Sequence, residues 1–275
     1  SGRLKYAVID PVYRKATAHA WKWLPVKPGR DAAIALGMIR WILDNKKYDA
    51  KYLSCANKAA AKAAGEPTWC NASWLVKIVD GKPRGLLKAQ EAGLPEVMLE
   101  KDGKSYRQEN FVAMAGGQPT AVDPYDEKTA VNGDLFFQGE VNGIKVKTAL
   151  QILLDEAASK NLTEWAKEAD VKPADLEELA REFTSHGKKA VVDIHRGVSQ
   201  HTSGYYNVLA WNTLNLLIGN LDHRGGFIKL STFSHRGDKA GQSYNVSKHP
   251  KKLAGFGLNI IRAGTKYEDT TIFNG

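Results

Sequence analysis

One unit occurs twice in the chain and constrains its fold more than any other feature: a short apolar run, then a polar loop, then an amphipathic helix. The first run, residues 6–9, stops at Asp10-Pro11, and the second is Ala190–Ile194. Short apolar runs that end at turn residues are typical of buried strands, and their alternation with helices favours a parallel sheet. We therefore predict an α/β fold in which both strands lie parallel in one sheet with flanking helices, and both following loops lie at the same edge.

Apolar residues at helical spacing predict the helices. The range Asp31–Leu43 has this spacing, and Asp31 is the expected N-cap. The Ala-rich range 50–64 predicts a second helix that ends at Gly65. Further helices are predicted over Lys147–Ser159, Leu162–Glu168, Pro173–Ser185 and Tyr205–Ile218.

The middle of the chain has a different pattern, in which short extended runs are broken by turn residues. Asp102-Gly103 and Asn142-Gly143 are strong signals for hairpin turns. We interpret residues 75–146 as a small β-hairpin insertion. It separates two parts that each contain one strand–loop–helix unit, residues 1–74 and residues 147–226. Residues 227–275 are rich in Gly, Ser and Lys without periodicity and predict a loop-rich tail that packs against further domains.

Charge and cysteine content limit the classes of function. Lys and Arg outnumber Asp and Glu by 39 to 30, which suggests an anionic partner such as a polyphosphate cofactor or an oxyanion. Nucleic acid is disfavoured because the basic residues are scattered, although a non-catalytic basic α/β module that binds nucleic acid or a protein remains an alternative. Cys55 and Cys70 are too few for an iron–sulfur cluster, and a small buried thiol is the expectation for Cys55.

Candidate ligand-binding residues follow each predicted strand, because ligands of parallel α/β sheets bind beyond the carboxyl ends of the strands. Asp10 ends the first strand, and Gly29 precedes a helix whose free N–H groups suit a phosphate or a nucleobase. In the second loop, Arg196 offers a fork for an anion and Gln200 a donor and an acceptor, while Gly197 permits close backbone approach. Neither a G-x-G-x-x-G nor a P-loop motif is present.

Two other kinds of site fit the sequence less well. His195 and His201 would suit a zinc ion, but no Cys, third His or acid stands at ligand spacing beside them. A serine hydrolase is disfavoured because the chain has no G-x-S-x-G motif.

Two sequence blocks carry a resemblance to a known family. Val8–Pro11 with Trp23–Ala33 resembles the "I-D-P … W-L-P-I-x-P-G-T-D-x-A" block of the dimethyl-sulfoxide-reductase superfamily. Gly197–Gly204, Leu214–Leu221 and Gly225-Gly226 resemble its second block, "G-x-x-Q-H-x-x-G … A-L-N-x-L-x-G-N-x-x-x-x-G-G". The chain is therefore identified as similar to molybdopterin oxidoreductases, which carry molybdenum or tungsten on two pterin guanine dinucleotides.

The resemblance implies a set of cofactor-binding residues. One group would contact a guanosine end, and another would lie along the pterin dinucleotide. The first consists of Ile9, Asp10, Pro11, Val12, Gly29, Arg30 and Asp31, and the second of Arg196, Gly197 and Gln200. Family members take their metal ligand and the cysteines for a 4Fe-4S cluster from segments outside this sequence. We therefore expect the 275 residues alone to bind neither metal nor cluster and to be catalytically inactive.

Within the superfamily, Asp49–Trp74 and Asp193–Gly197 are most similar to the catalytic chains of tetrathionate reductases. This resemblance implies a parent enzyme that cleaves tetrathionate into two thiosulfates in anaerobic respiration, with thiosulfate, polysulfide or arsenate reduction as alternatives. It also implies three partners: the remainder of the catalytic subunit, an iron–sulfur electron-transfer subunit, and a membrane anchor subunit. A periplasmic or other extracytoplasmic location is expected for the parent.

Overall fold

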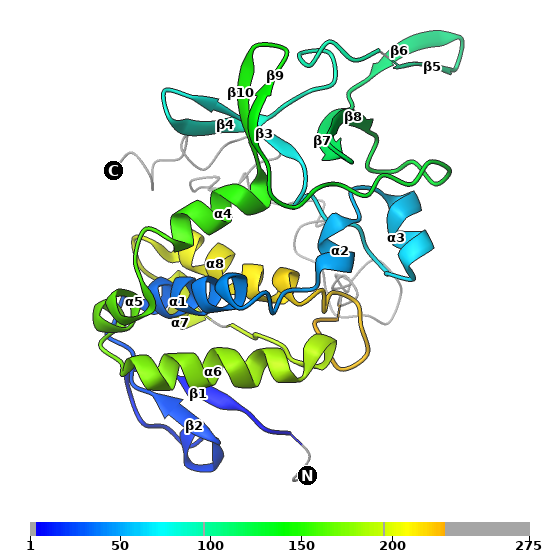
Figure 1. Ribbon diagram of the computed structural model, residues 1–275. Helices are drawn as coiled ribbons and strands as arrows, with labels where there is room; N and C mark the ends of the chain where they lie inside the picture. The colour runs from blue at the N-terminus through cyan, green and yellow to red at the C-terminus, as the bar shows by residue number, and fades with distance from the viewer. Residues whose placement is uncertain (1–3, 96, 195, 229–275) are drawn as a thin grey trace, which may run out of the picture. The chain divides into compact units, whose positions relative to one another are not determined.

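The computed structural model describes residues 4–95, 97–194 and 196–228. At the centre of its helical part lies α1 (Asp31–Asp44), which contacts α4 (Ala149–Ala157), α5 (Leu162–Ala169), α6 (Pro173–Ser185) and α8 (Gly204–Leu217) (Figure 1). Ile34, Ile39 and Ile42 of α1 are fully buried in this cluster. Gly37 permits the close approach of α6, since a Cβ there would lie 2.6 Å from Leu176 Cδ2.

The predicted helices are present, with three local differences. The helix predicted over Lys147–Ser159 begins at Ala149, because Lys147 and Thr148 belong to strand β10 (Ile144–Thr148). Arg30 rather than Asp31 is the N-cap of α1, so Asp31 is the first helical residue and its carboxylate does not cap. The Ala-rich range forms two helices, α2 (Ala50–Ser54) and α3 (Lys58–Ala64), rather than one. The chain leaves the helix between them because Cys55 forms a β-bridge with Asn132, and the Asn57 side chain caps α3.

The β-rich part contains a four-stranded antiparallel sheet and two separate hairpins. The sheet order is β4-β3-β10-β9, formed by β3 (Leu75–Val79), β4 (Lys82–Leu86), β9 (Gln138–Val141) and β10 (Ile144–Thr148). The hairpins are β5 (Val97–Lys101) with β6 (Lys104–Gln108), and β7 (Phe111–Ala115) with β8 (Gln118–Val122). Both predicted hairpin turns are confirmed, because Asp102-Gly103 and Asn142-Gly143 have positive φ at both residues.

The prediction of one parallel sheet that includes residues 6–10 and 190–194 is wrong. β1 (Ala7–Ile9) pairs in parallel with β2 (Lys22–Leu24) in a two-stranded sheet, and 190–194 form no strand. Side chains take the place of a neighbouring strand: Asn215 bonds the backbone of Val192, and Asn220 Nδ2 donates to the Ala190 carbonyl at 2.8 Å. The segment is held by α8 and the turn that follows it.

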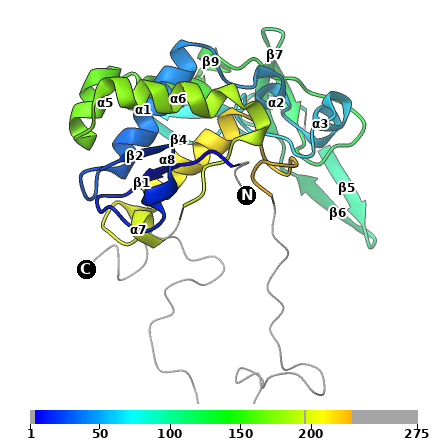
Figure 2. The same cartoon turned by 90° about the horizontal axis from the view of Figure 1, so that it is seen from below.

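The remaining elements are short. They are the 3-10 turns η1 (Thr17–His19) and η2 (Gly187–Lys189), and the one-turn helix α7 (Arg196–Ser199), which lies close to β1 in both views (Figures 1 and 2). No helix in the described ranges has the length and apolar character needed to cross a membrane. The predicted loop-rich tail lies outside the described residues, except for 227 and 228.

Candidate functional site

The first loop is shaped by Asp10, which directly follows β1 as expected. Its Oδ1 accepts from the Val12 N–H at 2.8 Å, and its Oδ2 pairs with Arg14 Nε at 3.3 Å. The Trp23 indole N–H also donates to the Asp10 carbonyl at 2.8 Å. Both carboxylate oxygens of Asp10 thus contact residues of the same loop. The neighbouring residues Val12 and Tyr13 are exposed. Sequence reasoning did not foresee this local role, although an Asp two residues before a free N–H is a common turn pattern.

At the start of α1, free space beside the backbone of Gly29 lies next to the partly buried carboxylate of Asp31. Gly29 has a φ of 77°, and a Cβ there would meet no atom within 4 Å, so ligand atoms have room to approach. Arg30 is half exposed, with Nη1 3.2 Å from Glu168 Oε1. The Asp31 side chain is only 15% exposed and lies in the first turn, where the N-terminal N–H groups favour negative charge.

The second loop presents its predicted residues to solvent. Arg196, Gly197 and Gln200 are all exposed on or next to α7. Gly204 begins α8 at a point where only glycine fits, because a Cβ would lie 2.0 Å from the Ser199 carbonyl oxygen. The loop is therefore folded tightly against the start of α8, while Arg196 and Gln200 face outward.

His201 connects the second loop to the start of α1. Its Nε2 lies 3.8 Å from Asp31 Oδ2 and 2.6 Å from Nδ2 of the buried Asn207. No role for Asn207 was predicted from the sequence. The available signal was a polar amide at a position of α8 where the helix pattern expects a buried apolar residue. Within the described ranges, which omit His195, no group of three His, Cys, Asp or Glu could hold a metal ion, so zinc gains no support there.

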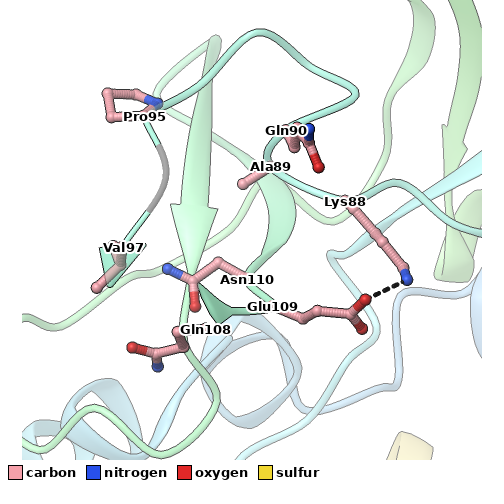
Figure 3. Close-up of a pocket in the computed structure, with 8 residues that line it drawn as sticks. All are labelled: Lys88, Ala89, Gln90, Pro95, Val97, Gln108, Glu109 and Asn110. Atoms are coloured by element: carbon pink, nitrogen blue, oxygen red, sulfur yellow. Dashed lines mark hydrogen bonds and ion pairs between the residues drawn. The ribbon is translucent and has the colours of Figure 1, made fainter. Parts of the chain in front are cut away.

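The structure brings some of the predicted residues together. Asp31 and the second loop meet through His201, whereas no hydrogen bond or ion pair between described residues joins Asp10 to Asp31 or Gln200. A pocket elsewhere, beside the β5–β6 hairpin, is lined by Lys88, Glu109, Asn110 and neighbours and contains none of them (Figure 3). That Asp10, Asp31 and Gln200 all contact one cofactor stays a prediction.

The two thiols are buried, as expected for Cys55. Burial raises the pKa of both, that of Cys70 to about 11. A protonated, enclosed thiol is a poor nucleophile and a poor metal ligand, so neither is a candidate for catalysis.

Comparisons with known proteins agree on one family. A family model described as molybdopterin oxidoreductase matches residues 1–266. A selenate reductase chain of Mesobacillus selenatarsenatis is 46% identical over 278 residues, covering 100% of this chain and 26% of that relative. Tetrathionate reductase chains of Salmonella typhimurium and Archaeoglobus fulgidus are 36% and 35% identical over 96% and 98% of the present chain. The chain spans about a quarter of the length of these relatives.

Proposed function

Because this chain belongs to the molybdopterin oxidoreductase family, we propose that it is the part of a catalytic subunit that holds a guanine dinucleotide end of the molybdenum cofactor. The observation that carries the proposal is the contact of His201 with Asp31, which links the two sequence blocks of the family at a helix N-terminus. When bound, the molybdenum–pterin group supplies two-electron transfer to the substrate.

The residues present fit such a group. Gly29 leaves open space at the helix start, and the carboxylate of Asp31 can accept the N–H donors of a guanine edge. The exposed guanidinium of Arg196 can pair with phosphate oxygens, and the amide of Gln200 can bond a heterocycle edge. Backbone freedom at Gly197, where a Cβ would meet no atom within 4 Å, allows the chain to lie against the ligand.

We propose that the whole enzyme reduces an oxyanion of sulfur or selenium. Tetrathionate was expected from the sequence, and its reduction cleaves the central S–S bond: one tetrathionate and two electrons give two thiosulfates. Selenate is favoured by the higher identity of the selenate reductase chain, and its reduction consumes two electrons and two protons to give selenite and water. The chain's excess of positive charge would attract either dianion.

The decisive experiment compares substrates with the full-length protein expressed with its neighbouring genes. With reduced viologen as electron donor, we expect viologen oxidation with selenate or tetrathionate at a kcat/KM at least tenfold above that with arsenate or thiosulfate. Purified protein without molybdenum and without bound guanine nucleotide would contradict the proposal. Salt-sensitive retention on DNA in that case would favour the alternative of a nucleic-acid-binding module.

Partners and location are also proposals. We expect two further subunits to copurify with the full-length protein, one for iron–sulfur electron transfer and one that anchors the complex to the membrane. A 4Fe-4S cluster is expected in the remaining segments of the full-length protein. An extracytoplasmic location is tested by fractionation of the native cells.

A further inference from the structure

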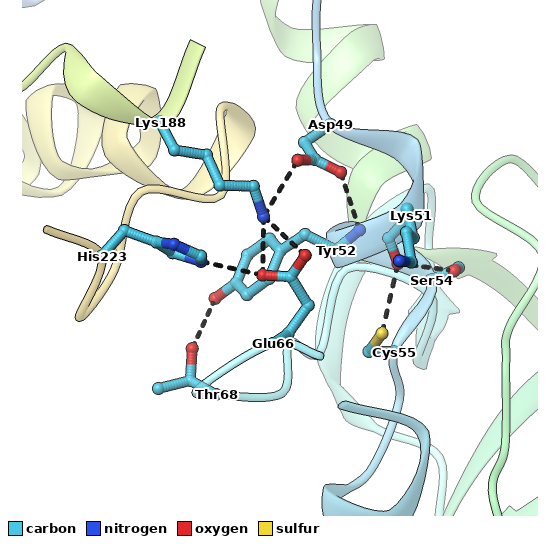
Figure 4. Close-up of polar contacts among 9 residues, drawn as sticks. All are labelled: Asp49, Lys51, Tyr52, Ser54, Cys55, Glu66, Thr68, Lys188 and His223. Carbon is cyan, nitrogen blue, oxygen red and sulfur yellow. Dashed lines mark hydrogen bonds and ion pairs between the residues drawn. The ribbon is translucent and has the colours of Figure 1, made fainter. Parts of the chain in front are cut away.

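A polar network surrounds the side chain of Glu66, which directly follows Gly65, the C-cap of α3 (Figure 4). The Lys188 ammonium donates to both Glu66 carboxylate oxygens at 2.6 Å, and His223 Nε2 lies 3.0 Å from Oε2. The Glu66 side chain is only 7% exposed. Charge-assisted hydrogen bonds are among the strong ones in proteins, and loss of one partner leaves a buried charge uncompensated.

Lys188 has two more contacts that fix its position. Its Nζ lies 3.1 Å from Asp49 Oδ2 and 5.5 Å from the centre of the Tyr52 ring. Asp49 caps α2 through the Tyr52 N–H at 2.9 Å, so the cation is held against the start of that helix. The Lys188 side chain therefore joins η2 to α2 and to the end of α3.

His223 brings a third segment to the same carboxylate. It lies in the turn after α8, which packs directly on η2: a Cβ at Gly226 would lie 2.6 Å from the Lys188 carbonyl oxygen. Asn220, in the same turn, bonds the Ala190 carbonyl. Glu66 thus contacts one side chain of η2, Lys188, and one side chain of the turn that packs on η2, His223.

We propose that Glu66 is a positioning residue for the second loop. By anchoring Lys188 and His223, it fixes the path of residues 188–192, which lead directly into the loop that carries Arg196, Gly197 and Gln200. The position of residues 188–192 follows from these contacts, whereas the effect of that position on cofactor binding rests on the proposed function. No other described residue replaces both contacts, because Asp49 contacts Lys188 but not His223.

The test measures hydrogen exchange and cofactor content in the full-length protein. Glu66→Gln keeps the side-chain volume but removes the charge, and we expect amides in residues 188–194 and 196–204 to exchange roughly 10- to 100-fold faster. Exchange in α6 and in the four-stranded sheet should stay unchanged, which separates positioning from general destabilisation. Molybdenum and guanine nucleotide per chain should fall at least twofold.

The control is Glu127→Gln, whose carboxylate pairs with Lys58 at the other end of α3 in an exposed ion pair. We expect it to leave both readouts unchanged. If Glu66→Gln does not fold, His223→Ala removes a single contact and should accelerate exchange in the same ranges less strongly.

The outcomes separate the two proposals. Exchange in residues 188–194 equal to that of the Glu127→Gln control would overturn the positioning role, and so would faster exchange with full cofactor content. A wild-type protein without molybdenum or nucleotide would instead refute the proposed function. The exchange data alone would then decide whether Glu66 fixes this segment.

Discussion

The side-chain amide of Asn215 forms two hydrogen bonds with the backbone of Val192, accepting from its N–H and donating to its carbonyl, each at 2.9 Å. Asn220 Nδ2 donates to Asn215 Oδ1 at 2.8 Å and supports this arrangement. Both asparagines are buried. Two side chains thus satisfy backbone groups that a neighbouring strand would otherwise satisfy, and buried backbone groups must find such partners.

Asn215→Leu should lower the free energy of unfolding by about 2–4 kcal/mol, because both backbone groups of Val192 and the Asn220 amide lose their partner. Urea unfolding followed by circular dichroism measures the change. Asn212→Leu on the same helix is the matched control, since Asn212 is only half-buried, and we expect a change of less than about 0.5 kcal/mol. Equal effects of the two substitutions would contradict the bracing role of Asn215.

Gly219→Ala should destabilise the chain by about 2–4 kcal/mol, because two effects add. The residue has a φ of 62°, and a Cβ would lie 2.9 Å from Tyr52 Cβ and Cγ. Gly65→Ala has a similar φ of 74° with nothing within 4 Å, so only the backbone penalty of about 1 kcal/mol should remain. Thermal unfolding of both variants tests whether the close contact with Tyr52 matters.

Stability should fall at alkaline pH because of Cys70. Burial raises the pKa of its thiol to about 11, whereas the pKa of a cysteine thiol in the unfolded chain is about 8.5. Between these values the folded state binds more protons than the unfolded state, so this contribution is intact below about pH 8.5 and decreases by about 1.4 kcal/mol per pH unit towards pH 11. Cys70→Ala should make this decrease less steep in unfolding experiments from about pH 8 to 11, while the contribution of Cys55, whose pKa burial also raises, should remain. An unchanged slope in the variant would refute the assignment.

Asp31→Asn in the full-length protein should lower its content of guanine nucleotide, since a carboxylate that accepts from two N–H donors contributes about 1.5–3 kcal/mol. Gly197→Val should lower it further, because the added side chain blocks backbone approach. Asp44→Asn is the control at the other end of α1, where the carboxylate pairs with Arg40. Nucleotide content per chain, measured after denaturation, checks all three. Normal content in Asp31→Asn would remove Asp31 from the cofactor site.

Local patterns determined much of this protein. The apolar spacing of α6 predicted Pro173–Ser185 to the residue, and the Asp-Gly and Asn-Gly dipeptides located two hairpin turns. Asp10 stands at the end of β1 as predicted. These features follow from interactions within a few residues, namely helical periodicity, proline at a helix start and positive φ at turn residues, so the sequence alone contains the information.

Only the tertiary structure determined which residues far apart in the sequence contact each other. Residues 190–194 have the composition of a buried strand, but the amides of Asn215 and Asn220 satisfy their backbone where a ladder was expected. Asp31 meets His201 from a distant part of the chain, and Glu66 reaches Lys188 and His223 across 122 and 157 residues. Such pairings depend on how α1, α3 and α8 pack together. No local pattern encodes them, because a side chain that satisfies a distant backbone group looks like any other polar residue.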